Sequence, residues 1–586
     1  MRLGTSGGNA AGDGLGVVVI GSGVAGLCAA IEAAKAGAEV LVLERDTAIG
    51  GASAMSGAAC NIVGTPLQEA QGIEDSVELA LADWIRTGGP TADVGWARRY
   101  LERSRVDVYD WCESLGITWA ALSQPEGNSV PRVHTPATWG RGIIEALAAR
   151  AESLGVRIAV GVEVEEIIVA DSVAQGVRAS FAGAEQRISA RAVVVCAGGF
   201  ASSHDLILEV APQFRELPRL LSGGAPGALG HGYRLLQSVG AQFACLDHIW
   251  VYPNGTPDPD DDSGVRGVGV RGIGGDIWLN SAGRRFVDEG NRNGGSGTRA
   301  LLAQPGQTAW SIFNSAELPN VVLLGNECWG TPAGGSRAAM DEFWRRSAFV
   351  WRADNPADLA ARIGLPADTV EAAVKAFNAS VLAGDDRDPE QGRRLEGVMP
   401  LEGPSLIAIQ FFPIAVKTFG GVRTDIECRV LDQDSAVIQG LFAAGEVAGM
   451  AGGCINGRFA LEGTMFGPCL YSGRVAGAAA GLQYAKRKGD TRMTEPVLPE
   501  HLMPDDQNFA ELNGLTIRKG TMGAFLANLR ILSGMPRDAP GREAVLEQLR
   551  QGIPTMRENG LFELFTFRSP ELAEAIGIEL SRDPSD

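Results

Sequence analysis

The sequence lacks the features that mark membrane and nucleic-acid-binding proteins. No apolar run in the 586 residues reaches the roughly 18 residues that a membrane-spanning helix needs. Lysine and arginine number 51 against 70 aspartates and glutamates, and the resulting net charge of −19 disfavours nucleic acid or an anionic membrane as a partner. The N-terminal segment has neither an apolar signal core nor twin arginines. We therefore expect a cytoplasmic protein.

Metal-binding patterns are also missing. The nine cysteines are scattered without a CxxC pair, and the five histidines show no metal-ligand spacing. Haem attachment and clustered cysteines for iron–sulfur centres are absent as well. The sequence therefore predicts free thiols in a reducing compartment and no metal site.

A nucleotide-binding pattern begins after the first 16 residues, in "VVVIGSGVAGLCAAIEAAKAGAEVLVLERD". Apolar periodicity predicts a buried strand over 17–20, an Ala-rich helix over 27–36 and a second strand over 39–43 that ends at Glu44. A dinucleotide-binding unit typically has these elements in this order: a strand, a glycine-rich turn, a helix, a second strand and an acidic residue at its end.

Each glycine of this G-x-G-x-x-G turn has a physical task. Gly21 makes the tight turn, Gly23 lets the backbone approach a pyrophosphate, and Gly26 lets helix pack on strand. The phosphates then lie at a helix N-terminus, and Glu44 accepts hydrogen bonds from ribose hydroxyls. The predicted binding residues of this unit are Gly21, Ser22, Gly23, Val24, Ala25, Gly26, Glu44 and Arg45.

Four further segments follow in a recognisable order: "RDTAIGGASAMSGAA", "ISARAVVVCAGGFA", "GLFAAGEVAG" and "GTMFGPCLYSGRVAG". Together with the first unit they resemble the flavoprotein family that contains soluble fumarate reductases, 3-ketosteroid dehydrogenases and tricarballylate dehydrogenase, over about residues 17–485. The resemblance implies FAD, which we expect to be non-covalent because the "GGASAMSGAA" loop has no histidine to link it.

The resemblance also implies further FAD contacts. Val164 would touch the adenine edge, Glu446 the ribityl or pyrophosphate end, and Thr464 and Met465 the flavin ring, at the start of a helix whose positive end favours negative charge on the flavin. The remaining implied contacts are Gly51, Ala52, Ser53, Ser56, Gly57, Ala197, Gly198, Gly199 and Gly445.

The predicted fold class is α/β: a Rossmann-like, glutathione reductase-like FAD-binding domain with an inserted α+β cap and a helical C-terminal extension. The cap should contain a strand-turn-strand at "IWLNSAGRRFVDE" and helices near 338–350 and 366–383, and the extension helices near 506–531 and 541–556. The extension is expected to dock on the core or to make a homo-oligomer. The expected segments are a flexible 1–16, FAD-binding 17–252, cap 253–412, FAD-binding 413–485 and extension 486–586.

Three residues are candidates for substrate binding by resemblance. Arg458, in "CINGR", matches the position where fumarate reductases hold a substrate carboxylate; the alternative is a salt bridge to Glu462 or Glu446. Lys417 matches a substrate-binding histidine and can donate a hydrogen bond or act as a base. Tyr252 matches a second histidine and can donate through its hydroxyl, or be a packed aromatic.

Glu289 and Arg292, in "VDEGNR", resemble the proton-relay pair of the reductases, with a cap salt bridge as the alternative. The segment "WSIFNSAELPN", where the reductases' catalytic arginine should lie, has none, and this favours substrate oxidation over reduction. His134 resembles a substrate-side loop position, but a lone histidine is more often structural.

These residues predict an FAD-dependent dehydrogenase or reductase acting on a carbon–carbon bond beside a carbonyl or carboxylate, with an electron acceptor that the sequence does not identify. Three alternatives stay open. One is a flavoprotein that oxidises a hydroxylated ring or an amine, another is the flavin subunit of an electron-transfer complex, and a third is an FAD-binding protein without catalytic activity.

Overall fold

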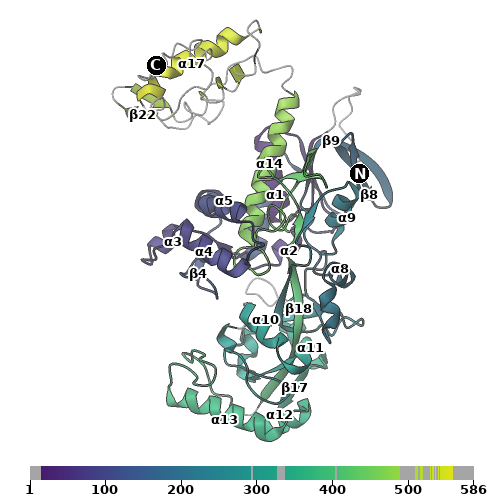
Figure 1. The fold of residues 1–586 in the computed structure, drawn as a ribbon, viewed down its shortest axis with the longest axis vertical. Helices are drawn as coiled ribbons and strands as arrows, with labels where there is room; N and C mark the ends of the chain where they lie inside the picture. The colour runs from purple at the N-terminus through teal and green to yellow at the C-terminus, as the bar shows by residue number, and fades with distance from the viewer. Residues whose placement is uncertain are drawn as a thin grey trace. The chain divides into compact units, whose positions relative to one another are not determined.

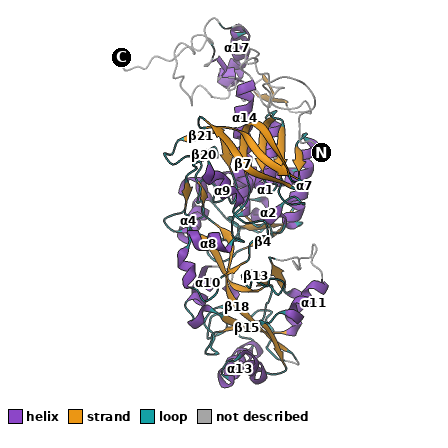
Figure 2. Ribbon diagram, turned by 90° about the vertical axis from the view of Figure 1, so that its right-hand side faces the viewer, coloured by secondary structure: helices purple, strands orange, loops and turns teal. Residues whose placement is uncertain are grey.

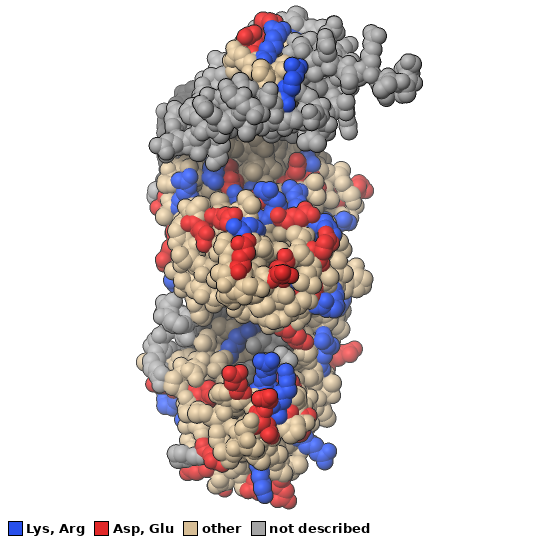
Figure 3. All heavy atoms as spheres, turned by 90° about the vertical axis from the view of Figure 1, so that its left-hand side faces the viewer, with Lys and Arg blue, Asp and Glu red and all other residues tan. Residues whose placement is uncertain are grey.

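The computed structural model describes residues 15–291, 295–325, 337–402, 405–488 and parts of 509–558. It divides into two compact units, Met1–Tyr484 and Ala485–Asp586. No described helix combines the length and apolar character that crossing a bilayer requires. Acidic and basic side chains are interspersed over the face shown in Figure 3 and form no patch of one sign there.

The centre of the first unit is a mainly parallel sheet in the order β20-β21-β8-β9-β1-β2-β6. The apolar strands β6, β2, β1, β9 and β21 run parallel, as is typical of a sheet that helices cover. Strands β7 and β8 instead form an antiparallel extension beside β9. The predicted strands of the nucleotide-binding unit are confirmed. The strands are β1 (Leu15–Ile20), β2 (Val40–Leu43), β6 (Arg157–Ala159), β7 (Val162–Ala170), β8 (Val173–Phe181), β9 (Ala184–Val195), β20 (Arg429–Leu431) and β21 (Val437–Ala443).

Two helices pack beside this sheet at very short range. A Cβ on Gly473 or Gly477 of α14 would lie 2.3 or 2.1 Å from the backbone carbonyl oxygens of Ala25 or Ala29 in α1. Only glycine allows this approach, so the glycine spacing in "GPCLYSGRVAG" serves helix packing. The helices of this part are α1 (Val24–Lys35), α2 (Gly51–Ala54), α3 (Pro66–Glu69), α4 (Val77–Gly88), α5 (Val94–Ser104), α6 (Trp111–Ser114), α7 (Trp139–Ser153), α8 (His204–Val210), α9 (His231–Ser238) and α14 (Phe466–Lys488).

A second sheet, in the order β14-β15-β18-β12-β13-β16, forms the cap. The long antiparallel strands β12 and β18 pass from the first sheet into the cap, as β18 shows in Figures 1 and 2. The elements are β12 (Ile249–Pro257), β13 (Gly267–Arg271), β14 (Ile277–Leu279), β15 (Ala309–Asn314), β16 (Val322–Leu324), β17 (Val350–Ala353), β18 (Leu406–Thr418), α10 (Gly295–Leu302), α11 (Arg337–Arg346), α12 (Pro356–Ile363) and α13 (Ala367–Ala383). Small pairings complete the unit: β3 (Cys60–Asn61), β4 (Trp119–Ser123), β5 (Val133–Pro136), β10 (Leu221–Ser222), β11 (Phe243–Ala244) and β19 (Gly421–Val422).

Two predictions of secondary structure need correction. The expected strand-turn-strand at 277–289 has its first strand and turn, but the return is a single bridge between Leu279 and Arg285 that leads into a short 3₁₀ helix. In the second unit, α17 (Arg542–Glu558) is the predicted helix, whereas β22 (Phe509–Leu512) and β23 (Leu515–Arg518) form an antiparallel hairpin within the range expected to be helical. The sequence "FAELNGLTIR" has an Asn-Gly dipeptide between two short apolar runs, and this is a sequence signal for a hairpin.

Candidate active site

The carboxyl ends of β1, β2, β9 and β21 meet at one edge of the central sheet, where open α/β sheets bind ligands. The turn after β1 is tight. Gly21 has φ +99°, and a Cβ on Gly26 would lie 2.0 Å from the Gly21 carbonyl oxygen. Both positions therefore require glycine, as predicted. Helix α1 begins at Val24, whose backbone N–H donates to the Ser53 hydroxyl (3.1 Å), and its N-cap Gly23 adds no side-chain acceptor. The other N–H groups of the first turn are therefore the ones that can bind an anion.

Glu44 organises the end of β2. One carboxylate oxygen accepts hydrogen bonds from the backbone N–H (2.9 Å) and hydroxyl (2.5 Å) of Ser22, and the other accepts from the backbone N–H of Asp46 (2.9 Å). Next to it, the Arg45 guanidinium donates to the carbonyl of Gly227. These bonds hold the acid at the strand end where a ribose hydroxyl can reach it.

The loops beyond these strands leave room for a cofactor. A Cβ on Gly51, Gly57 or Gly198 would meet no atom within 4 Å, so these backbones face open space. On the opposite side, Gly199 packs against Glu446, where a Cβ would lie 2.2 Å from the carboxylate. Open glycine backbones beside a helix N-terminus fit the pyrophosphate and ribityl chain of FAD.

Glu446 follows β21 and is held from one side. Its Oε1 accepts hydrogen bonds from the backbone N–H (2.9 Å) and hydroxyl (3.0 Å) of Thr418, and burial raises the pKa of its carboxyl group. At the far edge, Val164 is buried in β7 and its carbonyl is hydrogen-bonded to the ring of His231.

A cavity of about 400 Å³ lies between the central sheet and the cap. Predicted FAD contacts line one part of it: Ala52, Ser53, Ser56, Gly57, Glu446 and Met465. Apolar side chains make most of the remaining wall: Met55, Val322, Leu324, Ile414, Val416, Met450 and Phe466. Because Gly463, Met465 and Phe466 also border it, the positive N-terminus of α14 faces the cavity. Thr464 is instead fully buried, and its hydroxyl donates to the Leu461 carbonyl.

The polar groups of the cavity converge on Tyr252, and we call Tyr252, Glu462, Arg271 and Lys417 the tyrosine cluster. The Tyr252 hydroxyl donates a 2.6 Å hydrogen bond to Oε1 of Glu462. The Arg271 guanidinium lies over the tyrosine ring, 4.5 Å from its centroid, and the Lys417 Nζ lies 6.0 Å from it. All four line the cavity. An apolar pocket with a few convergent polar groups is typical of a small-molecule site.

Burial and the Glu462 carboxylate raise the pKa of the Tyr252 hydroxyl, and the positive charges of Lys417 and Arg271 oppose that shift. For Arg271, the attraction of Tyr252 and Glu462 outweighs the cost of burial and raises the guanidinium pKa. The hydroxyl thus keeps its proton, has an acceptor for it, and lies beside two cations that stabilise negative charge on a bound molecule.

Arg458 does not belong to this cavity. Its side chain is half exposed, and its guanidinium pairs with the Asp247 carboxylate at 2.6 Å. The expected alternatives, Glu462 and Glu446, are not its partners either. The arginine follows a turn in which Gly457 has φ +71°, and its backbone N–H donates to the Gly88 carbonyl.

Glu289 also lies elsewhere, in a set of cap residues that we call the cap ion cluster: Glu289, Arg285, Asp388 and Arg393. Arg285 binds Glu289 at 2.7 Å and Asp388 at 2.8 Å, and Arg393 lies 3.7 Å from Glu289. Burial raises the pKa of Glu289 despite these cations. The expected salt bridge in the cap therefore exists with Arg285 as the partner, and Arg292 lies outside the described residues.

His134 is a structural histidine. It lies fully buried in β5, with one ring nitrogen 2.7 Å from the Thr65 hydroxyl and the other 2.8 Å from the Arg132 carbonyl. Burial lowers the pKa of the imidazole to about 4. Tyr109 and Trp119 pack edge-on against the ring, so it has no access to the cavity.

The sequence argument missed Arg271 and assigned Glu462 only as a possible partner of Arg458. Arg271 ends "GVGVR", whose alternation predicts a strand with the arginine on one face, but "GVRGVGVRG" offers two similar arginines. Only the pairing of β13 with β12 shows which one lies beside Tyr252.

The carboxyl edge of the central sheet and the cavity beside it are typical of an oxidoreductase that binds a dinucleotide. Comparison with known proteins identifies the family. The family model described as "FAD binding domain" matches residues 16–464, and the chain belongs to this family. A KsdD-like steroid dehydrogenase of Mycobacterium tuberculosis is 29% identical over 544 residues, covering 79% of this chain and 95% of that protein. A probable fumarate reductase of Shewanella frigidimarina is 29% identical over 79% of this chain and 74% of that protein.

Solved structures agree. The open conformation of a flavocytochrome c3 fumarate reductase has a TM-score of 0.63 at 28% identity and covers 81% of this chain and 79% of its own. The 3-ketosteroid-Δ4-(5α)-dehydrogenase of Rhodococcus jostii RHA1 has a TM-score of 0.58 at 29% identity, covering 80% and 96%. The predicted resemblance, the FAD cofactor and the assignment as an FAD-dependent dehydrogenase or reductase are thereby confirmed.

Proposed function

We propose that this protein oxidises a carbon–carbon bond next to a carbonyl or carboxylate, with the reacting end of its substrate beside Tyr252. The observation that carries the proposal is the Tyr252–Glu462 hydrogen bond in an otherwise mainly apolar cavity, with Arg271 and Lys417 next to it. FAD, when bound, accepts the hydride, and the residues of the chain manage charge and proton.

The proton of the carbon beside the carbonyl goes to the Tyr252 oxygen. Because burial disfavours a phenolate, Tyr252 passes its own proton to Glu462 as it accepts one from the substrate. Arg271 and Lys417 stabilise the negative charge that develops on the substrate carbonyl or carboxylate oxygen. In this proposal Arg271 takes the role that the sequence assigned to Arg458.

Substrate choice follows from the wall of the cavity. Met55, Leu324 and Ile414 favour an apolar molecular body, and the cations favour one carbonyl or carboxylate end. The two relatives are named for substrates with one or the other of these groups: a steroid dehydrogenase for the carbonyl group and a fumarate reductase for the carboxylate group. We propose an apolar ketone or acid as the substrate, and non-covalent FAD held by the glycine loops and Glu44.

Anaerobic titration of the FAD-loaded protein tests this function. Addition of a saturated 3-ketosteroid, a cyclic ketone or an aliphatic acid should bleach the flavin absorption, and mass spectrometry should find a desaturated product. A flavin that no saturated compound reduces, but that an unsaturated acid reoxidises after chemical reduction, would reverse the proposed direction. Reduction by an alcohol or an amine without desaturation would overturn the proposed chemistry.

A further inference from the structure

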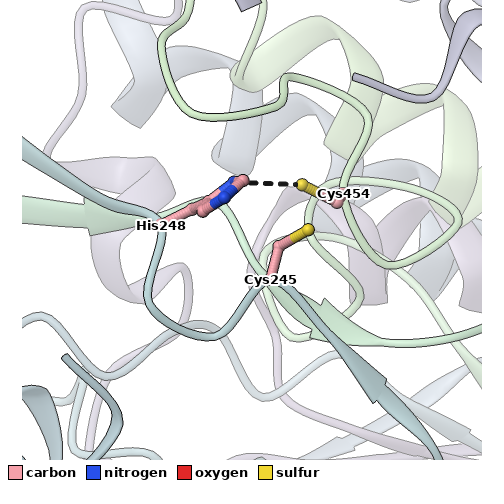
Figure 4. A group of neighbouring side chains, drawn as sticks. All are labelled: Cys245, His248 and Cys454. Atoms are coloured by element: carbon pink, nitrogen blue, oxygen red, sulfur yellow. Dashed lines mark hydrogen bonds between the residues drawn. The ribbon is translucent and has the colours of Figure 1, made fainter. Parts of the chain in front are cut away.

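A second cluster of reactive side chains lies outside the cavity. Cys245 and His248 come from the loop between β11 and β12, and Cys454 comes from the loop after β21. Figure 4 shows the three side chains pointing toward one another. Their potential ligand atoms all lie within 4.8 Å of one another, and the Cys454 Sγ lies 3.5 Å from Nδ1 of His248. None of the three lines the cavity.

This spacing is close to that of a zinc site. With Zn–S near 2.3 Å and Zn–N near 2.0–2.1 Å, tetrahedral ligands lie about 3.5–3.8 Å from one another. The observed separation of at most 4.8 Å exceeds this by about 1 Å or less. Nε2 of His248 lies 3.9 Å from an Asp247 carboxylate oxygen, the kind of neighbouring group that orients a ligating histidine.

We propose that Cys245, His248 and Cys454 bind a zinc ion, with solvent at the fourth position on the partly exposed side of Cys245. Two sulfur donors and one imidazole select a soft or borderline metal rather than Mg²⁺ or Ca²⁺. The sequence does not indicate this site, because Cys454 is far along the chain from the Cys-x-x-His pair of Cys245 and His248.

The position of the ion suggests what it does. Cys245 and His248 precede the strand that carries Tyr252, whereas Cys454 precedes Glu462. The Arg458–Asp247 ion pair joins the same two segments. Zinc therefore acts as a structural link between the two chain segments that supply the tyrosine and its acceptor.

Metal analysis of the full-length FAD-loaded protein tests the site. Protein stripped with a chelator under reducing conditions and reloaded with Zn²⁺ should retain one zinc per chain. Co²⁺ in its place should give tetrahedral d–d bands at red wavelengths, where oxidised flavin does not absorb. Cys454→Ser and His248→Gln should each weaken zinc binding at least tenfold. Cys112→Ala, at a buried thiol outside the cluster, is the matched control and should bind as the wild type does.

Three results would overturn the proposal. One is a reduced wild-type protein that retains no zinc and gives no cobalt bands. A second is equal zinc in the wild type and in both ligand variants, with flavin content and circular dichroism showing that they fold. A third is a Cys245–Cys454 disulfide in the protein as isolated, detected as two missing thiols. None of these readouts depends on turnover, so they test the site separately from the proposed activity.

Discussion

The tyrosine cluster of the cavity and the cap ion cluster both place arginine near glutamate but differ in what surrounds the charges. In the cap, Arg285 lies between Glu289 and Asp388, all three side chains are almost fully buried, and Glu289 does not line the cavity of the tyrosine cluster. In the tyrosine cluster, Glu462, Arg271 and Lys417 keep surface on a cavity that has room for a substrate. A fold loses stability when one partner of a buried ion pair is removed, whereas charges that face a cavity can act on a ligand.

The difference shows why a motif alone did not locate the chemistry. Glu289 lies in a segment that resembles a proton relay, yet its carboxylate is occupied by arginines of the cap. Glu462 lies in no comparable motif, yet it is the acceptor of the tyrosine hydroxyl in the cavity. The following predictions test whether this division into structural and catalytic clusters is correct.

The largest effect is expected from Tyr252→Phe. This change keeps the ring and its packing but removes the proton-transferring hydroxyl, so turnover should fall by up to about 10⁴-fold, or ~5 kcal/mol of barrier. Stopped-flow measurement of flavin reduction with a reducing substrate checks it. Tyr233→Phe, at a buried tyrosine whose hydroxyl bonds the Gly420 carbonyl, is the matched control. Comparable rates for Tyr252→Phe and the wild type would remove the tyrosine cluster from the chemistry.

Replacing one glutamate by glutamine in each cluster distinguishes a contribution to stability from a contribution to catalysis. Glu289→Gln leaves Arg285 without one of its buried partners and should lower the free energy of unfolding by about 4 kcal/mol, while the folded protein retains its turnover. Glu462→Gln should have the opposite profile, with turnover lost and the free energy of unfolding nearly unchanged. Urea unfolding and flavin reduction rates, measured on both variants, give the two readouts. Similar profiles for both variants would contradict the division.

The buried His134 predicts a pH dependence of stability. Its pKa is about 4 in the folded protein against 6.5 for an unperturbed histidine, so the unfolded chain binds its proton more readily. Stability from this residue is therefore complete above about pH 6.5 and is lost as the pH falls toward 4, by about 3 kcal/mol. Urea unfolding across this range should show the loss in the wild type and in His204→Gln, but not in His134→Gln. A loss that persists in His134→Gln would assign it to other groups.

Much of the fold could be predicted from the sequence because its signals are local. Buried strands, the glycine turn after β1 and the helix α1 follow from apolar runs and from backbone positions such as Gly21 that only glycine fills. The cap helices α11 and α13 likewise follow from periodicity. The hairpin of β22 and β23 differs from the helix expected over 506–531, because apolar periodicity in this range does not distinguish a helix from two short paired strands.

The residues that we propose for catalysis were harder to predict because their arrangement depends on contacts between distant strands. Lys417 and Tyr252 reach the same cavity because β18 pairs with β12, and Arg271 joins them through β13. Arg458 and His134 lie at positions that match motifs of the family. The side chain of Arg458, however, pairs with a surface carboxylate, and the ring of His134 packs against buried aromatic side chains. A sequence motif specifies the residue type at a position, whereas the direction of its side chain depends on the tertiary packing.

The smallest effect is expected from Arg458→Ala, and it tests the boundary of the tyrosine cluster. The ion pair with Asp247 is half exposed, so its loss should cost less than about 1 kcal/mol of stability. Because the guanidinium lies outside the cavity, KM and turnover should change little, whereas Arg271→Ala should lower kcat/KM by about 10²- to 10³-fold through lost charge stabilisation. Steady-state kinetics on both variants decide the matter. A large rise in KM for Arg458→Ala would mean that this arginine turns toward the cavity when substrate binds, and the substrate-binding role would return from Arg271 to Arg458.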